Sequence, residues 1–289
     1  MNSFIITTDS NSDLPKSYLE AKDIRIISHY YNIDGEDYGE DHLLSDKEFY
    51  DRMRAGSMPT TMASNPAEIL RVFTKCAEEG KDVLHISFSS GLSCGYNNVS
   101  MGAREIEENY PERKIKVVDS LNVSMSQGLL IMQAVEMREA GKSFEEVVEW
   151  VEEHKLEYCC QFTVDDLFHL NRGGRLSKTS AVVGSILNIK PILYVDDNGA
   201  LLALEKTRGR KVSMKKIVDN MIERMGKFYA EDATIGIVHG DCPEDVEILK
   251  KMVLEKVPKA NLIINTVGPS IGAHSGPGAL GLLFKGERR

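Results

Sequence analysis

Short apolar runs rich in β-branched residues alternate with helical segments through the first half of the chain. Residues 3–9 and 24–31 are predicted strands, and the runs at 82–88 and 114–119 are each followed by a loop and then a helix. This order is typical of βαβ units, whose parallel strands form a sheet covered by helices. Because ligands of such sheets gather at the carboxyl ends of the strands, we expect functional residues in the loops that follow them.

Two helices in this half have recognisable N-terminal sequences. Ser45 and Glu48 stand at the spacing of a capping box. Asn65 is a predicted N-cap, Pro66 occupies the first helical position, and Gly80 follows the last apolar position of the stripe. We therefore predict helices that begin after Ser45 and after Asn65, the second over residues 65–80.

The pattern changes near residue 160. The turn sequence Asp197-Asn198-Gly199 separates two predicted strands, which indicates an antiparallel hairpin. The elements predicted around and after it are strands at 191–195, 200–206, 233–239 and 260–267 and helices at 211–229 and 243–257.

We predict an α/β protein of two domains. Residues 1–160 form a Rossmann-like parallel sheet with its helices. Residues 161–289 form an α+β domain with a largely antiparallel sheet. The helix at 65–80 is assigned to the first domain, with packing against the second domain as the alternative.

Composition and charge exclude several classes of protein. The 289 residues are 42% apolar, which is enough for a sizeable core. The net charge is −9 and no block of consecutive Lys or Arg is present, which argues against a broad contact with nucleic acid or with an anionic membrane surface. A small anion held by a few local donors is still compatible with this charge.

The cysteines and the start of the chain indicate a reducing compartment. Five cysteines occur without a CxxC pair, so neither a disulfide framework nor a zinc site has the spacing it needs. The first residues, MNSFIITTDS, lack the basic and apolar regions of a signal peptide, and no apolar run is long enough to span a bilayer. We expect a cytoplasmic protein without metal, cofactor or integral membrane segment.

Four loops combine glycine, proline and hydroxyl residues next to predicted strands or helices. They cover residues 8–10, 59–61, 89–95 and 268–278. A single loop of this kind is usually a solvated turn or a helix cap, which is our interpretation of Ser10 and Ser120.

Taken together, the loops offer donors for a small anion. Gly91 and Gly95 let backbone N–H groups approach a ligand, and Thr61 and Ser93 add hydroxyl donors. These loops contain no Lys or Arg, and the chain has no GxxxxGK[ST] motif. They therefore suit one diffuse negative charge, such as a carboxylate, better than a polyphosphate.

The loop at 91–95 also supports an alternative function. Its sequence GLSCG matches GxSxG, and Asp119 and His274 follow in the Ser, Asp, His order of α/β-hydrolases. In these enzymes the nucleophilic serine follows sharply on the end of a strand, whereas Ser89, Ser90 and Gly91 intervene here after Phe88. No HGGG-type oxyanion loop is present either. A serine hydrolase that uses Ser93, Asp119 and His274 is the alternative hypothesis. Cys94 fits a small buried thiol better than a nucleophile.

His274 and a group of arginines are the basic candidates. The imidazole of His274 lies in the Gly-rich segment 268–278 and can donate a hydrogen bond to a carboxylate. The other histidines show no metal-ligand spacing. Arginines near glycines in the second half form either a solvated patch or a contact for phosphate on a partner's nucleotide. They are Arg172, Arg175, Arg208 and Arg210.

Several of these segments occur in the order of a known family. They are TDSNSDLP, PTT, SSGLS followed by Tyr96, VVDS, LNRGGRLS, LNIKPIL and GPSIGAHSGPGALGLLF. In these motifs the chain resembles the DegV family, the fatty-acid-binding proteins that serve as the B subunit of bacterial fatty acid kinase. The resemblance spans nearly the whole chain. It implies a two-domain protein that buries one long-chain fatty acid in a tunnel between its domains.

The resemblance also implies roles for residues and for a partner. Thr61, Ser93 and His274 would bind the carboxylate, and the region of Arg172 would face an ATP-dependent fatty acid kinase subunit that makes the acyl phosphate. The chain itself would be a lipid-binding subunit and not an enzyme.

The sequence departs from the family at two places. Met62-Ala63-Ser64-Asn65 stands where Ser-Gln-Pro-Ser usually follows the PTT threonines, and Cys94-Gly95 replaces Gly-Thr before Tyr96. Thr61 and Ser93 are retained. The changes therefore bear on local backbone geometry and acyl-chain preference more than on head-group binding.

Most of the affinity of such a site would come from the tail, since burying one methylene contributes about 0.8 kcal/mol. Chain-length selection would then depend on apolar helical residues, each of which also fits ordinary core packing. The candidates are Ile69, Phe73, Leu129, Leu130, Met132, Ile186 and Leu187.

Overall fold

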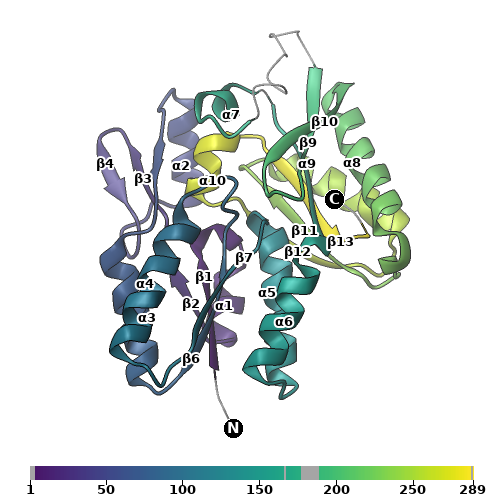
Figure 1. The fold of residues 1–289 in the computed structure, drawn as a ribbon. Coiled ribbons are helices and arrows are strands. Elements are labelled where there is room, and N and C mark those ends of the chain that lie inside the picture. Colours follow the sequence, from purple (N-terminus) through teal and green to yellow (C-terminus); the bar gives the residue numbers. More distant parts are fainter. Residues whose placement is uncertain (1–3, 166, 177–188, 288) are drawn as a thin grey trace.

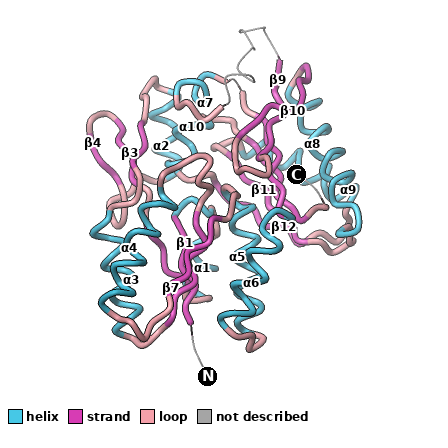
Figure 2. The backbone as a smooth tube through the Cα atoms, in the orientation of Figure 1, coloured by secondary structure: helices cyan, strands magenta, loops and turns pink. Residues whose placement is uncertain are grey.

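The computed structural model describes residues 4–165, 167–176, 189–287 and 289. A parallel sheet lies at the lower left of Figure 1 and a mixed sheet at the upper right, with helices on their faces. Figure 2 shows the same arrangement by secondary structure, including a small sheet beside helix α2. The predicted α/β architecture with a parallel and a largely antiparallel part is confirmed.

The parallel sheet has the strand order β2-β1-β6-β7, and its neighbouring strands all run parallel. Its strands are β1 (Phe4–Asp9), β2 (Ile24–Ile27), β6 (Asp82–Ser87) and β7 (Ile115–Asp119). The turn η1 (Ser10–Ser12) and helix α1 (Lys16–Ala21) follow β1. Helices α3 (Pro66–Glu78) and α4 (Gly95–Asn109) cover one face, and α5 (Ser124–Glu139) and α6 (Phe144–His154) cover the other. The predicted βαβ pattern is confirmed.

Local sequence sets where the helices begin. Ser45 Oγ accepts a hydrogen bond from Glu48 N at 3.2 Å, and α2 (Asp46–Arg54) begins after it. Asn65 Oδ1 accepts from Ala67 N at 2.9 Å, and α3 begins at Pro66. Both predicted N-caps are therefore present, but the capping box is only half formed, because the Glu48 carboxylate accepts from Arg52 Nη2 at 2.7 Å. Helix α3 packs against α4, β2 and β6, so it lies with the parallel sheet.

The single strand predicted at 24–31 is wrong. β2 ends at Ile27, and β3 (Tyr30–Ile33) forms a small antiparallel sheet with β4 (Glu36–Tyr38) and β5 (Thr60–Met62). At the break, the His29 N–H donates to Ser10 Oγ at 3.0 Å, and His29 Nε2 lies 3.3 Å from Asp9 Oδ1. These polar contacts hold His29 beside the loop after β1, so the chain leaves the parallel sheet after Ile27.

The mixed sheet has the order β10-β9-β8-β13-β11-β12, and its neighbouring strands are antiparallel except for β11 and β12. Its strands are β8 (Tyr158–Thr163), β9 (Ile189–Val195), β10 (Leu201–Arg208), β11 (Thr234–His239), β12 (Asn261–Thr266) and β13 (Leu280–Lys285). Helices α8 (Arg210–Met225) and α9 (Pro243–Lys256) cover the outer face. The inner face packs against α5.

Several elements differ from the sequence prediction. The strands β8 and β13 were not predicted, and β8 crosses the division at residue 160, which stays a prediction. The segment 268–278 is not a loop throughout, because it contains the helix α10 (Pro269–Ser275). Helix α8 ends at Met225, before the expected 229, since Gly226 takes a φ of +48° and starts the turn η3 (Gly226–Phe228). The turn η2 (Lys155–Glu157) precedes β8, and α7 (Phe168–Arg172) follows it.

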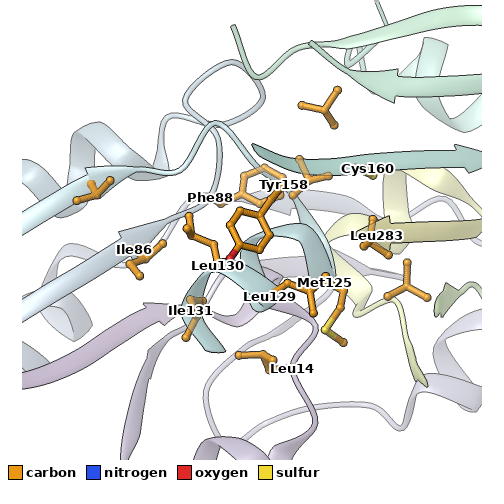
Figure 3. Close-up of a cluster of buried hydrophobic side chains, with 14 of the residues drawn as sticks. Leu14, Ile86, Phe88, Met125, Leu129, Leu130, Ile131, Tyr158, Cys160 and Leu283 are labelled. Carbon is orange, nitrogen blue, oxygen red and sulfur yellow. The ribbon is translucent and has the colours of Figure 1, made fainter. Parts of the chain in front are cut away.

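One core cluster runs through both sheets. It contains Ile86 of the parallel sheet, Leu130 and Met125 of α5, and Cys160 and Leu283 of the mixed sheet. Figure 3 shows these side chains gathered around α5. The two sheets are thus held in one orientation by a shared apolar core.

Polar contacts add to this junction. Ser89 Oγ donates to Gly199 O at 2.8 Å, which joins the loop after β6 to the β9–β10 hairpin. Arg289 donates from Nη1 to Leu121 O at 2.7 Å and to Asp196 O at 2.8 Å.

Asp13 is a buried acid at the same junction. Its Oδ1 accepts from Gly268 N at 2.9 Å, and its Oδ2 accepts from Ser124 Oγ. Burial raises the pKa of this carboxyl to about 7, and Asp46 adds to the shift, although both hydrogen bonds oppose it. The Asp13 carboxyl therefore links the start of α5 to the start of α10.

Replacing Gly91 by alanine should weaken the junction. A Cβ at this position would lie 2.7 Å from Asn198 O and 2.8 Å from Gly199 O, so backbone must shift. We expect Gly91→Ala to lower the free energy of unfolding by about 1–3 kcal/mol in urea titrations. The neighbouring Ser90→Ala, at an exposed site, should stay within about 0.5 kcal/mol of the parent. Equal stability of the two variants would contradict this account.

Candidate functional site

The loops that follow the strands of the parallel sheet meet around one cavity. Asn11 follows β1, His29 follows β2, Ser93 follows β6 and Ser124 follows β7, and all of them line a cavity of about 200 Å³. An apolar cavity of about 150 Å³ already holds a benzene-sized ligand. The expectation that polar loop residues gather at the carboxyl ends of these strands is confirmed.

Helix α10 forms a second wall. Ser270, Ile271, His274 and Ser275 line the cavity. Their spacing places them on one face of the helix. Figure 1 shows α10 between α2 and α7, and it also contacts the strands β3 and β5 of the small sheet. The helix therefore carries His274 into a space that the parallel-sheet loops also reach.

The mixed sheet supplies an apolar wall. Its contributions come from β8, β10, β11 and β13, and further apolar side chains come from the surrounding loops and helices. They are Phe88, Leu92, Val123, Cys160, Phe162, Leu170, Leu201, Val238, Val267, Ala279 and Leu280. Among the described residues that line the cavity, none is Asp or Glu. The cavity thus has polar loops on one side and an apolar sheet face on the other.

Thr61 and His274 are hydrogen-bonded to each other. Thr61 Oγ1 lies 2.9 Å from His274 Nε2. Burial lowers the pKa of His274 to about 4, and the charges of Arg175 and Arg172 add to the shift, so the imidazole is neutral at pH 7.

The surroundings of His274 decide its tautomer. Its buried Nδ1 has no hydrogen-bond partner among the described residues, and a Cβ on Gly173 would lie only 2.1 Å from this atom. A buried unpaired N–H is costly, so the proton sits on Nε2 and is donated to Thr61 Oγ1. The hydroxyl proton of Thr61 is then available to a ligand.

Ser93 is arranged in a similar way. Its Oγ accepts a hydrogen bond from Gly95 N at 3.1 Å, at the start of α4. Within the described part of the chain, the structure gives its hydroxyl proton no acceptor. Ser93 and Thr61 thus both present a free O–H donor to the cavity.

Two of the four candidate arginines, Arg172 and Arg175, make different contacts at the site. Arg175 lines the cavity and donates from Nε to Leu92 O at 3.2 Å. Arg172 does not line it. Its Nη2 donates to Pro59 O at 2.7 Å and to Ala273 O at 3.2 Å, which ties together the segments that carry Thr61 and His274.

Comparison with known proteins shows the family of this chain. The sequence model described as an uncharacterised protein of the DegV family matches residues 3–287. A DegV domain-containing protein of Clostridium perfringens is 41% identical over 291 residues, covering 100% of this chain and 99% of its own length. This chain belongs to the DegV family.

Solved DegV structures share the whole fold. A DegV family protein from Thermus thermophilus, described with fatty acid binding, superimposes with a TM-score of 0.87 at 27% identity, covering 98% of this chain and 99% of that one. A stearic-acid-binding protein from Eubacterium ventriosum gives 0.90 at 26% identity and 98% of both chains. DegV from Bacillus subtilis, described as a fatty acid binding protein, gives 0.86 at 28% identity, covering 99% of this chain and 100% of that one.

In this DegV chain the hydrogen bonds of the hydrolase candidates lead elsewhere. His274 Nε2 contacts Thr61, and Ser93 Oγ is held by Gly95 N. Asp119 Oδ1 accepts from Ser90 N and from Leu121 N, each at 3.1 Å. The described contacts therefore do not join Ser93, His274 and Asp119 into a relay.

Some sequence interpretations need correction. Gly91 and Gly95 do not line the cavity. Gly91 packs against the β9–β10 hairpin. Gly95 leaves room for the ring of His29, because a Cβ added at this position would lie 3.1 Å from His29 Nε2. Cys94 is not a buried thiol, since it is exposed and lines the cavity. Ser10 and Ser120 accept backbone N–H bonds from His29 and Asn122. Ser120 is fully buried, so the solvated turn predicted there is wrong.

The predicted tail-binding residues are mostly elsewhere. Ile69 and Phe73 lie in the core between α3 and the parallel sheet, and Leu130 of α5 is fully buried in the core shared by both sheets. Leu129 and Met132 line a separate cavity beside α5 and the mixed sheet. Ile186 and Leu187 lie outside the described residues. The apolar wall comes instead from strands that the sequence prediction missed or assigned no role.

Sequence reasoning also missed polar members of the site. Asn11 lies within the TDSNSDLP motif, and its Nδ2 is 3.2 Å from His29 Nδ1. His29 Nε2 lies 3.3 Å from Asp9 Oδ1. Burial raises the pKa of the Asp9 carboxyl, but the contacts with His29 and His85 outweigh burial and hold this pKa well below its usual range. Asn11 carried a usable signal, its place after the first strand. His29 carried none, because it was placed within a strand.

Among the described residues, no group of three or more His, Cys, Asp and Glu side chains is arranged to hold a metal ion. No helix in that part of the structure has the length and apolar character needed to cross a membrane.

The pKa of His274 predicts a pH-dependent stability. Because its pKa is about 4 when folded and 6.5 when free, the neutral form stabilises the fold above pH 6.5, and this contribution is lost as pH falls toward 4. We expect unfolding in urea to show a difference between the parent and His274→Gln that changes by on the order of 2 kcal/mol across this range. His42→Gln, at an exposed site, should change by less than about 0.5 kcal/mol. A pH-independent difference for His274→Gln would contradict a neutral, buried imidazole.

Proposed function

We propose that this chain binds a long-chain fatty acid in the cavity between the sheets. Its carboxylate would accept hydrogen bonds from Thr61 and Ser93, with His274 holding Thr61, and its tail would lie along the apolar wall. The observation that carries this proposal is the pair of free hydroxyl donors on a wall whose described residues include no Asp or Glu, opposite an apolar sheet face.

The donor set fits a single carboxylate. Two hydroxyl groups can satisfy a carboxylate, which accepts several hydrogen bonds. Arg175 adds one positive charge on the cavity wall. A polyphosphate would need more cationic donors than this wall provides.

The apolar wall fits a long tail. Each buried methylene contributes about 0.8 kcal/mol, so about ten methylenes outweigh typical association costs and leave micromolar or tighter binding. The Thermus thermophilus, Eubacterium ventriosum and Bacillus subtilis proteins are described as fatty acid binding, which supports the same ligand class here.

Lipid extraction tests the ligand class directly. Protein purified from cells should release a stoichiometric long-chain acid on extraction and mass spectrometry. Delipidated protein should bind palmitate or oleate in a competition assay. A protein that is empty and also ignores both added acids would refute the proposal. Release of a different small carboxylate would replace the fatty acid with that ligand.

Removal of either hydroxyl should weaken binding of the head group. Ser93→Ala and Thr61→Ala each remove one donor to a buried carboxylate, so we expect a loss of about 1–3 kcal/mol in the binding free energy of palmitate by calorimetry. Ser90→Ala and Thr60→Ala are matched controls, because both are exposed neighbours that do not line the cavity. Unchanged affinity in both Ser93→Ala and Thr61→Ala would show that the carboxylate lies elsewhere.

We also propose that the loaded protein presents the acid to an ATP-dependent kinase subunit, which phosphorylates the carboxylate to an acyl phosphate. The family resemblance suggests this partner. Arg172 is exposed beside α10 and the segment before Thr61, so its guanidinium is close to the groups that would hold the reacting carboxylate. An ATP-dependent partner would place this step in the cytoplasm.

Substitution of Arg172 tests the partner surface. In a coupled assay with the kinase subunit, we expect Arg172→Ala to raise the KM for the loaded protein about five- to tenfold, since a rim charge mainly affects encounter. Palmitate affinity is measured in parallel, because Arg172 also holds Pro59 O and Ala273 O. Arg104→Ala, an exposed change on α4, serves as the control. An unchanged KM for Arg172→Ala would exclude this residue from the kinase contact.

A further inference from the structure

A second cavity lies along the same face of the mixed sheet as the ligand cavity. Residues paired across antiparallel strands place their side chains on the same face. Phe162, Gly281 and Val238 are paired in this way on β8, β13 and β11, and all of them line the ligand cavity. They form the first row of the inner face.

The second cavity belongs to a row further along the same strands. Tyr158 is paired with Lys285, and Thr234 stands two residues before Gly236 on β11. All three residues line a cavity of about 230 Å³. Since same-face residues repeat about every 7 Å along a strand, this row lies roughly 13 Å from the first one.

The row between them is filled. It consists of Cys160, Leu283 and Gly236, which are paired across β8, β13 and β11. Met125 of α5 packs onto it, and a Cβ on Gly236 would lie 2.5 Å from Met125 Cγ. Met125 and Leu283 are both fully buried, and Figure 3 shows them together with Cys160 and Leu129. Glycine at position 236 thus provides the seat for the Met125 side chain.

We propose that Met125 is a plug that sets the chain-length limit of this site, and that the second cavity receives the tail of longer acids when the plug moves. This inference rests on the proposed binding of a fatty acid. Methionine has three rotatable side-chain bonds and adapts to irregular spaces, so it can be displaced without moving the strand beneath it.

The far end of the second cavity explains where the path would stop. Lys285 Nζ lies 3.1 Å from Glu157 Oε2 and 4.6 Å from the ring centroid of Phe228. Glu136 of α5 also lines this cavity. An apolar tail gains nothing from these charged groups, so the useful apolar length ends at this row. Leu129, between Met125 and this end, lines the second cavity and continues the apolar path.

A chain-length series tests the plug. Binding of myristate, stearate and behenate to delipidated protein is measured by competition with a fluorescent acid. Each further methylene that is buried raises affinity about fourfold. For the parent we expect affinity to rise from myristate to stearate and then to level off. For Met125→Ala we expect at least about a tenfold gain for behenate, with myristate unchanged within about twofold.

Two more variants test whether the gain comes from opening the row of Met125. Leu283→Ala opens the same row from the sheet side and should give the same gain if Met125→Ala fails to fold. Thr234→Phe fills the second cavity and should remove the gain in the Met125→Ala background while leaving myristate binding intact. Parallel chain-length profiles for the parent and both alanine variants would overturn the plug and leave fatty acid binding standing. Failure of the parent to bind any of the acids would overturn both proposals.

Discussion

Helix α5 is packed between the parallel sheet and the mixed sheet, and the rest of the structure depends on this double contact. A helix that meets apolar surfaces on two sides must be apolar over most of its circumference. The run from Ser124 to Leu130 is buried at every position. Its polar members Ser126 and Gln127 donate hydrogen bonds to Val123 O and Thr8 Oγ1. Since α5 can satisfy both sheets in only one orientation, it places the carboxyl ends of the parallel strands opposite the inner face of the mixed sheet.

The electrostatics of the junction follow from this placement. The chain carries a net charge of −9, yet the buried acids Asp9 and Asp13 do not line the cavity. Asp9 is enclosed by His29, His85 and the Phe88 N–H, and Asp13 by Ser124 and the Gly268 N–H. Among the described residues, the polar groups on the cavity wall are hydroxyls, imidazoles, the Asn11 amide, cysteine thiols and the Arg175 guanidinium. An acidic protein can therefore offer a local environment that accepts an anion.

Local signals and long-range contacts differ in how far the sequence predicts them. Asn65 with Pro66, and Asp197-Asn198-Gly199, act over a few residues, and the structure has the helix and the hairpin that they predict. The strands β8 and β13 were missed because the Gly-rich segment before Leu280 masked one, and the change of pattern around Cys159 and Cys160 masked the other. Thr61, Ser93 and His274 were brought together from loop chemistry and family resemblance, and the structure places them on one cavity. Ser93 is held by a local turn through the N–H of Gly95, whereas the contact of the His274 ring with Gly173 depends on packing that no local pattern predicts.

The hydrogen bond between Thr61 and His274 crosses the junction, because one residue comes from the strand β5 and the other from α10. The arrangement that would hold a carboxylate therefore exists only while these segments are docked. By mass action, a ligand that binds only the docked state stabilises docking in proportion to its occupancy. Ligand exit would then be coupled to separation of the segment that carries Thr61 from α10. The empty protein would be the form in which these segments separate most readily.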